Sequence, residues 1–205
     1  MPELGRWLEF WKRIGAKGDP QKAYYMLEGL YSVQQRAYHN LSHIGRCLDE
    51  YHPARHLPEH PDEVEMALWF HDAFYDTMAA DNETRSAQLA YRISRDIGLP
   101  DLFAGNVHDL ILETRHIVTP FDIDSQVLAD VDLSILGTPE VEFDEYENNI
   151  RKEYRWVPDW QFRAGRAKIL GDFLARPSIY STEFFREKYE GQARRNIERS
   201  LARLG

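Results

Sequence analysis

Three short segments of this sequence carry side chains that could bind a divalent metal ion. They read YHNLSH at 38–43, FHDAFYD at 70–76 and LADVDLS at 128–134. Imidazole nitrogens and carboxylate oxygens form a mixed set of donors that suits Mn, Mg, Fe, Ni or Zn and does not select among them. An ion held in this way would lower the pKa of a bound water. Hydrolysis by a metal-activated water is therefore the chemistry that such residues would support.

The first segment contains two histidines with helical spacing. His39 and His43 are four residues apart, so on one helix both rings would lie on the same face. A zinc protease of the HExxH type has this spacing but requires a glutamate directly after the first histidine, where this chain has Asn40. Exposed helix faces often carry such pairs, so the spacing alone is a weak indication of a shared site.

The second segment places His71 and Asp72 directly after an apolar run at 67–70. An ionised carboxylate in such surroundings is costly unless it is coordinated or paired, so a metal site and a buried His–Asp hydrogen bond both fit the pattern. Adjacent residues on a helix diverge by about 100°, which requires a shared ion to lie close against the helix. Asp76 would share a helical face with Asp72 and could accept a proton from a metal-bound water; the alternative is a surface acid near the helix end.

The third segment supplies an aspartate from a distant part of the chain. Asp130 and Asp132 lie among apolar residues, where a carboxylate needs a partner. Two residues at this spacing on a helix diverge by about 200°, so only one of the two carboxylates is expected to face the site. The residues by themselves leave open which one.

The order of these groups, a histidine, then a His–Asp pair, then an aspartate, resembles the HD superfamily of metal-dependent phosphohydrolases. That family carries the same ligands in the same order on a helical core. The resemblance implies that one or two divalent ions are bound by His43, His71, Asp72 and Asp132. Nearly the whole chain is also similar to a bacterial group of uncharacterised, predicted HD phosphohydrolases, through segments such as ALWFHDAFYD, DNETRSAQLA and RKEYRWV. This second likeness implies the fold and the ligands but no substrate.

The YHNxxH form at 38–43 further resembles the class I cyclic-nucleotide phosphodiesterases. In those enzymes the first histidine donates a proton to the leaving group and the second binds metal, which implies a catalytic role for His39. Asp132 and the two residues after it are similar to their ligand aspartate and its successors, so the resemblance favours Asp132 over Asp130. Asp130 would then face away and form a hydrogen bond with a backbone amide or an arginine.

Four further polar residues are secondary candidates. Glu83 could hold a water or a second ion, and His116 could be an extra ligand. Arg36 and Arg85 could neutralise a substrate phosphate. Each of the four could instead form a salt bridge or a helix cap. Cys47 could approach the metal, but a small buried hydrophobic side chain is its expected role.

Helical periodicity dominates the sequence and predicts the elements that must position these residues. Pro61 followed by acidic residues is typical of a helix first turn, and that helix should run to about Met78. Asp81 could cap the next helix, which would end near Gly98.

We therefore expect an all-α, HD-type helical bundle that forms a single domain over 1–205. Its metal-binding core would cover about 20–140, and the helices of 141–205 would pack on it and line a pocket. The later helices are expected at 101–116, 140–155, 159–175 and 182–203.

The composition of the chain indicates which cellular compartment and which classes of binding partner to expect. A net charge of −9 repels nucleic acid and anionic membranes, and no stretch approaches the roughly 20 apolar residues of a membrane span, so neither partner is expected. The acidic field would also repel a phosphate ester unless bound cations reverse its sign locally. A single cysteine and an N-terminus without a signal-peptide run favour a cytoplasmic protein. The expected substrate is a small phosphorylated molecule, with nucleotides included; its identity and the oligomeric state stay open.

Two other functions are compatible with a helical chain that binds metal. A carboxylate-bridged di-iron bundle needs an ExxH motif from each of two helices, and the sequence has one, from Glu113 to His116. A sensor module could bind a nucleotide and a metal without turnover. Intact ligands at all four positions favour an enzyme, because buried charged ligands serve little structural purpose.

Overall fold

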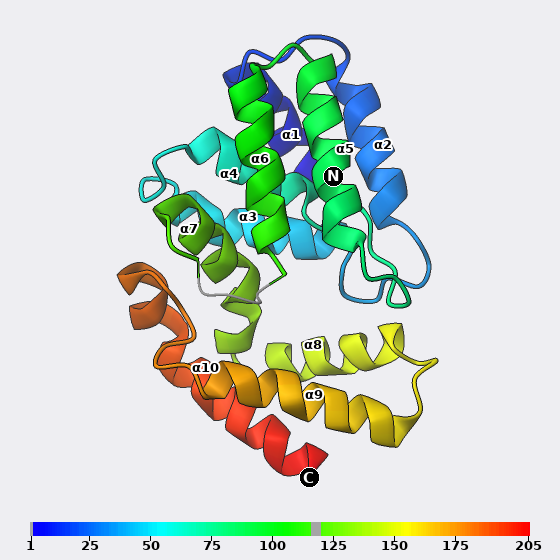
Figure 1. Ribbon diagram of the computed structural model, residues 1–205, viewed down its shortest axis with the longest axis vertical. Helices are drawn as coiled ribbons and strands as arrows, with labels where there is room; N and C mark the ends of the chain where they lie inside the picture. The colour runs from blue at the N-terminus through cyan, green and yellow to red at the C-terminus, as the bar shows by residue number, and fades with distance from the viewer. Residues whose placement is uncertain (1, 116–119) are drawn as a thin grey trace.

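Helices form every regular element among the residues that the computed structural model describes, 2–115 and 120–205 (Figure 1). The prediction of an all-α fold is therefore confirmed for this part of the chain. The helices expected after Pro100 are present, with ends within three residues of those predicted. The elements in chain order are α1 (Pro2–Arg13), α2 (Pro20–Tyr31), α3 (Leu41–Ala54), α4 (Pro61–Phe70), α5 (Asn82–Asp96), α6 (Asp101–Glu113), α7 (Ile123–Asp132), the short 3₁₀ helix η1 (Leu133–Gly137), α8 (Glu140–Glu153), α9 (Asp159–Leu174) and α10 (Glu183–Leu204).

Capping residues begin several of these helices where the sequence provides them. The Asp19 side chain accepts hydrogen bonds from the first amides of α2, and Asn40 accepts one from the amide of Ser42 in α3. Thr182 caps α10 in the same way. These caps satisfy amides that have no partner inside the helix, and the cap at Asn40 sets where α3 begins.

An aromatic core joins the first helix to the helix that precedes the His–Asp pair. Trp7 of α1 and Trp69 of α4 are both fully buried, and their ring centroids are 5.2 Å apart in an edge-to-face arrangement. Phe70 also contacts the Trp7 ring, at 6.3 Å between centroids. The end of α4 is therefore held in the most densely buried part of the molecule.

The last three helices lie to one side of the first six, and α7 leads from one group to the other (Figure 1). The close approach of α10 to η1 requires a glycine at Gly137, because a Cβ there would lie 2.5 Å from Cβ of Tyr189. Asn196 of α10 donates hydrogen bonds to the carbonyls of Leu136 and Thr138, at 2.9 and 2.8 Å. The helices of 141–205 are thus anchored at the segment that directly follows Asp132.

Two helix boundaries differ from the sequence-based expectation. The helix predicted from Pro61 to about Met78 ends at Phe70. Its last carbonyls are bound by distant side chains: the Tyr31 hydroxyl donates to Trp69 O, and Arg36 donates to the carbonyls of Asp72 and Ala73. Because these donors replace the amides of a further helical turn, the chain can leave the helix at this point.

The other difference is at the start of α3. The Asn40 cap places His39 before the first residue of the helix, whereas His43 lies in its first turn. Their spacing had predicted that the two histidines share a helical face. The structure shows that they do not, because His39 precedes the helix. Their rings still come close, with centroids 5.8 Å apart.

Candidate metal centre

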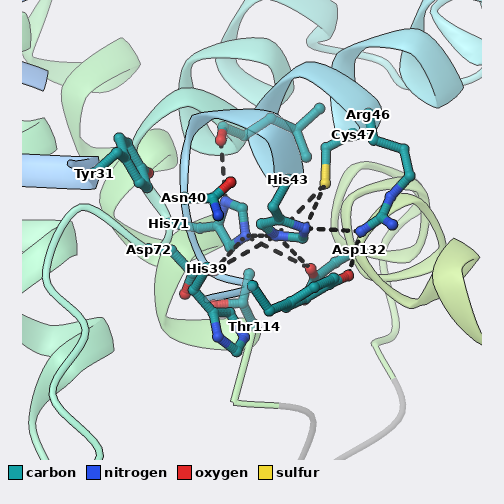
Figure 2. Close-up of polar contacts among 12 residues, drawn as sticks. Tyr31, His39, Asn40, His43, Arg46, Cys47, His71, Asp72, Thr114 and Asp132 are labelled. Atoms are coloured by element: carbon teal, nitrogen blue, oxygen red, sulfur yellow. Dashed lines mark hydrogen bonds and ion pairs between the residues drawn. The ribbon is translucent and has the colours of Figure 1, made fainter. Parts of the chain in front are cut away.

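Three helix ends bring the predicted ligands to one point. His43 lies in the first turn of α3, His71 and Asp72 directly follow α4, and Asp132 is the last residue of α7. Figure 2 shows these side chains directed toward one another. Residues from three separate parts of the sequence thus form one cluster.

The donor atoms of the cluster are spaced as the ligands of one ion would be. The Nε2 atoms of His43 and His71 are 3.1 Å apart, and Oδ1 of Asp132 lies 3.3 Å from the first and 3.6 Å from the second. Oδ2 of Asp72 lies 3.2 Å from His71 Nε2 and 3.5 Å from His43 Nε2. Donors bonded to one ion at typical metal–ligand lengths stand about 3.0–3.4 Å apart. The donor atoms of His43, His71 and Asp132, which all lie within 4.8 Å of one another, therefore fit a shared metal, and Asp72 adjoins this trio through the two imidazoles.

The cluster combines buried imidazoles with partly accessible carboxylates. The side chains of His43 and His71 are essentially inaccessible, whereas those of Asp72 and Asp132 are 17% and 19% exposed. Burial lowers the pKa of His43. Burial also acts to lower the pKa of His71, but the charges of Asp72 and Asp132 outweigh it and raise that pKa well above its ordinary value. Without a cation, the cluster therefore retains a proton that a metal would replace.

The hydrogen bonds of His71 leave its second nitrogen available to an ion. His71 Nδ1 lies 3.0 Å from the carbonyl of Leu68 and donates to it, so Nε2 points into the cluster and would bind an ion once its proton is released. Metal-binding histidines commonly use a backbone carbonyl in this way.

His43 is held differently. Its Nδ1 lies 3.2 Å from a guanidinium nitrogen of Arg46, which can only donate, so this arrangement places the ring proton on Nε2. An ion at Nε2 requires that proton to move to Nδ1. The Arg46 nitrogen would then turn from the ring toward the Tyr38 hydroxyl, to which it already donates.

Cys47 lies behind His43, with Sγ 3.7 Å from each ring nitrogen. The thiol is buried, as expected for a small hydrophobic side chain, and burial raises its pKa well above its ordinary value. A thiolate is disfavoured here, so the oxygen and imidazole donors define the cluster.

His39 lies beside the cluster and is fixed by a buried carboxylate. Glu153, the last residue of α8, places Oε2 2.7 Å from His39 Nδ1, and its Oε1 accepts the backbone amides of Tyr38 and His39 at 2.7 and 3.0 Å. The His39 ring also stacks on Tyr75, with centroids 3.8 Å apart. Burial acts to raise the pKa of Glu153, but these hydrogen bonds and the His39 ring lower it overall.

The sequence analysis did not identify Glu153 as a functional residue. A signal was nevertheless present, because Glu153 falls on the buried face of α8 with Phe143 and Ile150. A carboxylate on an apolar helix face needs a partner, and here the partner lies more than a hundred residues away in the sequence.

A cavity of about 990 Å³ adjoins the cluster and is bordered by Asp132 and His39. Much of its remaining wall comes from α8 and α9, so the helices after Asp132 line a pocket. The wall combines aromatic rings with cationic groups, among them Tyr146, Phe162 and Arg166. Arg166 is buried and forms an ion pair with Glu147, which fixes its guanidinium at the cavity wall.

The side chains of Asp76 and Glu83 do not belong to the cluster of potential metal ligands. Asp76 is exposed in the turn after α4 and accepts the amide of Met78 at 2.9 Å, so the expected shared helical face with Asp72 is wrong. Glu83 lies in the first turn of α5, with Oε2 3.7 Å from Nε of Arg115. Arg115 in turn borders the cavity.

The predicted arginines have different surroundings. Arg36 donates to the carbonyls of Asp72 and Ala73 at 2.6 and 2.9 Å, and thereby positions the segment that carries the His–Asp pair. Arg85 is exposed and lies over the Phe74 ring at 4.3 Å from its centroid. His116 lies outside the described residues.

Asp130 faces away from the cluster. It is almost fully buried and accepts hydrogen bonds from the amides of Ser181 and Thr182 and from the Thr182 hydroxyl, each at 2.7 Å. The expected contact with backbone amides is therefore confirmed. Asp132, in contrast, is the aspartate of this pair that lies among the ligand atoms of His43 and His71.

A comparison of the chain with family models, curated proteins and solved structures found no match. Among the described helices, none combines the length and the apolar character that crossing a membrane requires. Any functional assignment therefore depends on the geometry of the site.

Proposed function

We propose that this protein is a divalent-metal-dependent phosphohydrolase of the HD type. The observation that carries the proposal is the convergence of His43, His71, Asp72 and Asp132, with donor spacings of 3.1–3.6 Å. Two imidazoles and two carboxylates suit Mn, Mg, Fe, Ni or Zn, as one ion or two. When bound, the metal would polarise a phosphoryl oxygen and supply a water of lowered pKa.

The residues beside the cluster would handle the proton of the leaving group. The Glu153 carboxylate fixes the His39 ring through Nδ1, which leaves Nε2 as the nitrogen for proton transfer. A proton donor must present its N–H to the leaving group, and the contact through Nδ1 leaves Nε2 for that position. His39 thus combines a catalytic position with an orienting partner, and it need not be a ligand.

The adjoining cavity supports a small phosphorylated substrate. Its volume of about 990 Å³ is at the upper end of the range usual for small-molecule sites. The net charge of −9 would repel such a substrate from most of the surface. The metal would reverse that sign locally, because three of the cationic side chains at the cavity wall, Arg115, Arg166 and Lys168, already form ion pairs with acidic side chains.

The test is a metal-by-metal assay of the purified protein after chelator treatment. The protein without metal should be inactive, and a divalent ion should restore hydrolysis of at least one compound in a panel of phosphate esters and nucleotides. Mn, Mg, Fe, Ni and Zn would each be added back separately. Activity that is undiminished after complete metal removal would refute the proposal. Tight nucleotide binding without product, with every metal, would indicate a sensor module instead.

A further inference from the structure

A second group of potential metal ligands lies at the opposite ends of two helices that position the first centre. His60 precedes α4, Glu63 lies in the first turn of α4, and Asp124 lies in the first turn of α7. Each offers one donor atom, and these three atoms all lie within 4.8 Å of one another. His60 Nδ1 is 2.8 Å from Asp124 Oδ2 and 3.8 Å from Glu63 Oε2.

The Glu63 carboxylate has an oxygen without a hydrogen-bond partner. Glu63 is 8% exposed, and its Oε2 is buried and accepts no hydrogen bond from the residues that the structure describes. The other oxygen accepts a long hydrogen bond of 3.4 Å from Asn106. A buried carboxylate oxygen without a donor costs free energy, and burial raises the pKa of Glu63 accordingly. This oxygen is the one that lies 3.8 Å from His60 Nδ1.

The carboxylates of Glu63 and Asp124 also differ from the neighbouring acids in the basic side chains that pair with them. The adjacent Asp62 and Glu65 each form ion pairs with Arg13 and Arg55. Within the described part of the chain, the only basic side chain in ion-pair contact with Glu63 and Asp124 is His60, which is neutral when it acts as a ligand. Asp124 also accepts the backbone amides of Glu59 and His60, so Glu63 is the less compensated carboxylate, and a divalent cation between the two would balance its charge.

We propose that His60, Glu63 and Asp124 bind a second divalent transition-metal ion, of which zinc is the representative, separate from the first centre. An imidazole and two carboxylates give three protein ligands, water can complete a tetrahedron, and the imidazole disfavours Mg and Ca. The ligand atoms of a tetrahedral zinc ion stand about 3.4 Å apart. This value lies between the distances from His60 Nδ1 to Asp124 Oδ2, 2.8 Å, and to Glu63 Oε2, 3.8 Å. The half-exposed His60 ring can make this adjustment.

The location assigns the second ion a structural role. The helices α4 and α7 have 10 residues each, so each is about 15 Å long. At their far ends they position His71, Asp72 and Asp132. A metal that joins their N-terminal ends would fix the two helices relative to each other without contacting the substrate.

Zinc titration of the full chain tests this proposal in a background that lacks the first centre, the double variant D72A/D132N. That background should still bind one zinc ion. Adding H60A or E63Q should weaken this binding by at least about 100-fold, since even the loss of an outer-shell partner costs 10–100-fold. The control is H108A, which removes a histidine that contacts a single aspartate at 2.9 Å, and it should leave zinc affinity unchanged.

Thermal unfolding supplies a second readout that does not depend on activity. Zinc should raise the Tm of the double-variant background and leave the Tm of its E63Q derivative unchanged. Without metal, E63Q should be at least as stable as its parent, because it removes a buried charge, and this separates lost binding from lost folding. A background that binds no zinc, or equal zinc affinity with and without H60A and E63Q, would overturn the proposal.

Discussion

Glu153 provides the sharpest test of how the site is organised, because its carboxylate joins a histidine to the backbone around it. The perturbation is Glu153→Gln, which keeps the volume of the side chain and removes its charge. The amide oxygen can still accept the backbone amides of Tyr38 and His39. The amide nitrogen replaces the carboxylate oxygen that lies 2.7 Å from His39 Nδ1, so the ring loses its anionic partner.

The expected loss of stability follows from these contacts. Hydrogen bonds to a charged group contribute about 1.5–3 kcal/mol each and neutral ones about 1 kcal/mol, so weakening two bonds and losing one would cost about 2.5–7 kcal/mol. Relief of the desolvation of a buried charge offsets part of this cost. Since the pKa of Glu153 is lowered overall, its hydrogen bonds outweigh the desolvation. We therefore expect a net loss of about 1–3 kcal/mol at pH 7, or roughly 2–12 °C in Tm.

The pH dependence gives this prediction a sign that can be checked. A carboxyl whose pKa is lower in the folded state stabilises the protein above its unfolded pKa of about 4.3, and this contribution is lost as pH falls through the folded value. The difference between the wild type and Glu153→Gln should therefore shrink as the pH drops below about 4. Urea unfolding at a series of pH values, followed by circular dichroism, measures it.

A matched control lies on the same helix. Glu145 is exposed, so Glu145→Gln makes the same change of charge and should alter stability by less than about 0.5 kcal/mol. Glu153→Gln should also lower turnover with the metal retained and shift the pH–rate profile, whereas a purely structural role would leave that profile unchanged. Equal stability of the two variants at pH 7, or a difference that grows in acid, would refute the reasoning.

Three further predictions concern the cluster itself. His39→Ala should lower turnover of a substrate with a poor leaving group by roughly 10²–10⁴-fold and keep the metal; loss of metal would make His39 a ligand. Asp72→Ala should lose the metal while circular dichroism shows the helices intact, and full occupancy by elemental analysis would contradict its role as a ligand. Asp132→Asn should lose metal in a titration and Asp130→Asn should retain it; the reverse result would mean that the last ligand is misassigned by two residues.

Apolar surroundings, in which an unpaired polar group is costly, pointed to His71, Asp72 and the aspartates near position 132, whereas the candidate ligand set with His43 came from the resemblance. His71 and Asp72 follow the fully buried Trp69 and Phe70, and the residues around Asp132 are buried as well. Such local contrast between a charged residue and its neighbours is visible without tertiary information. The choice of Asp132 over Asp130 came from the resemblance, since both aspartates show that contrast, and the structure gives Asp130 its own partners in Ser181 and Thr182.

The end of α4 could not be predicted in this way. Local propensity favours continuing the helix through His71 to Met78, and the residues that stop it are Tyr31 and Arg36, which are distant in sequence. The same holds for the partner of His39, because Glu153 reaches it across 114 residues of sequence. Interactions of this kind depend on tertiary packing, which periodicity does not describe.

The error at the start of α3 has a functional consequence. Had His39 been within the helix, its ring would have shared the face of His43. Because α3 begins after the Asn40 cap, the backbone amide of His39 is available to Glu153, and the same carboxylate also binds the ring through Nδ1. A helix boundary shifted by two residues thus gives two histidines of identical chemistry different surroundings, one among the candidate ligands and the other beside Glu153. Spacing alone cannot make that distinction, because it depends on which backbone amides the helix leaves unpaired.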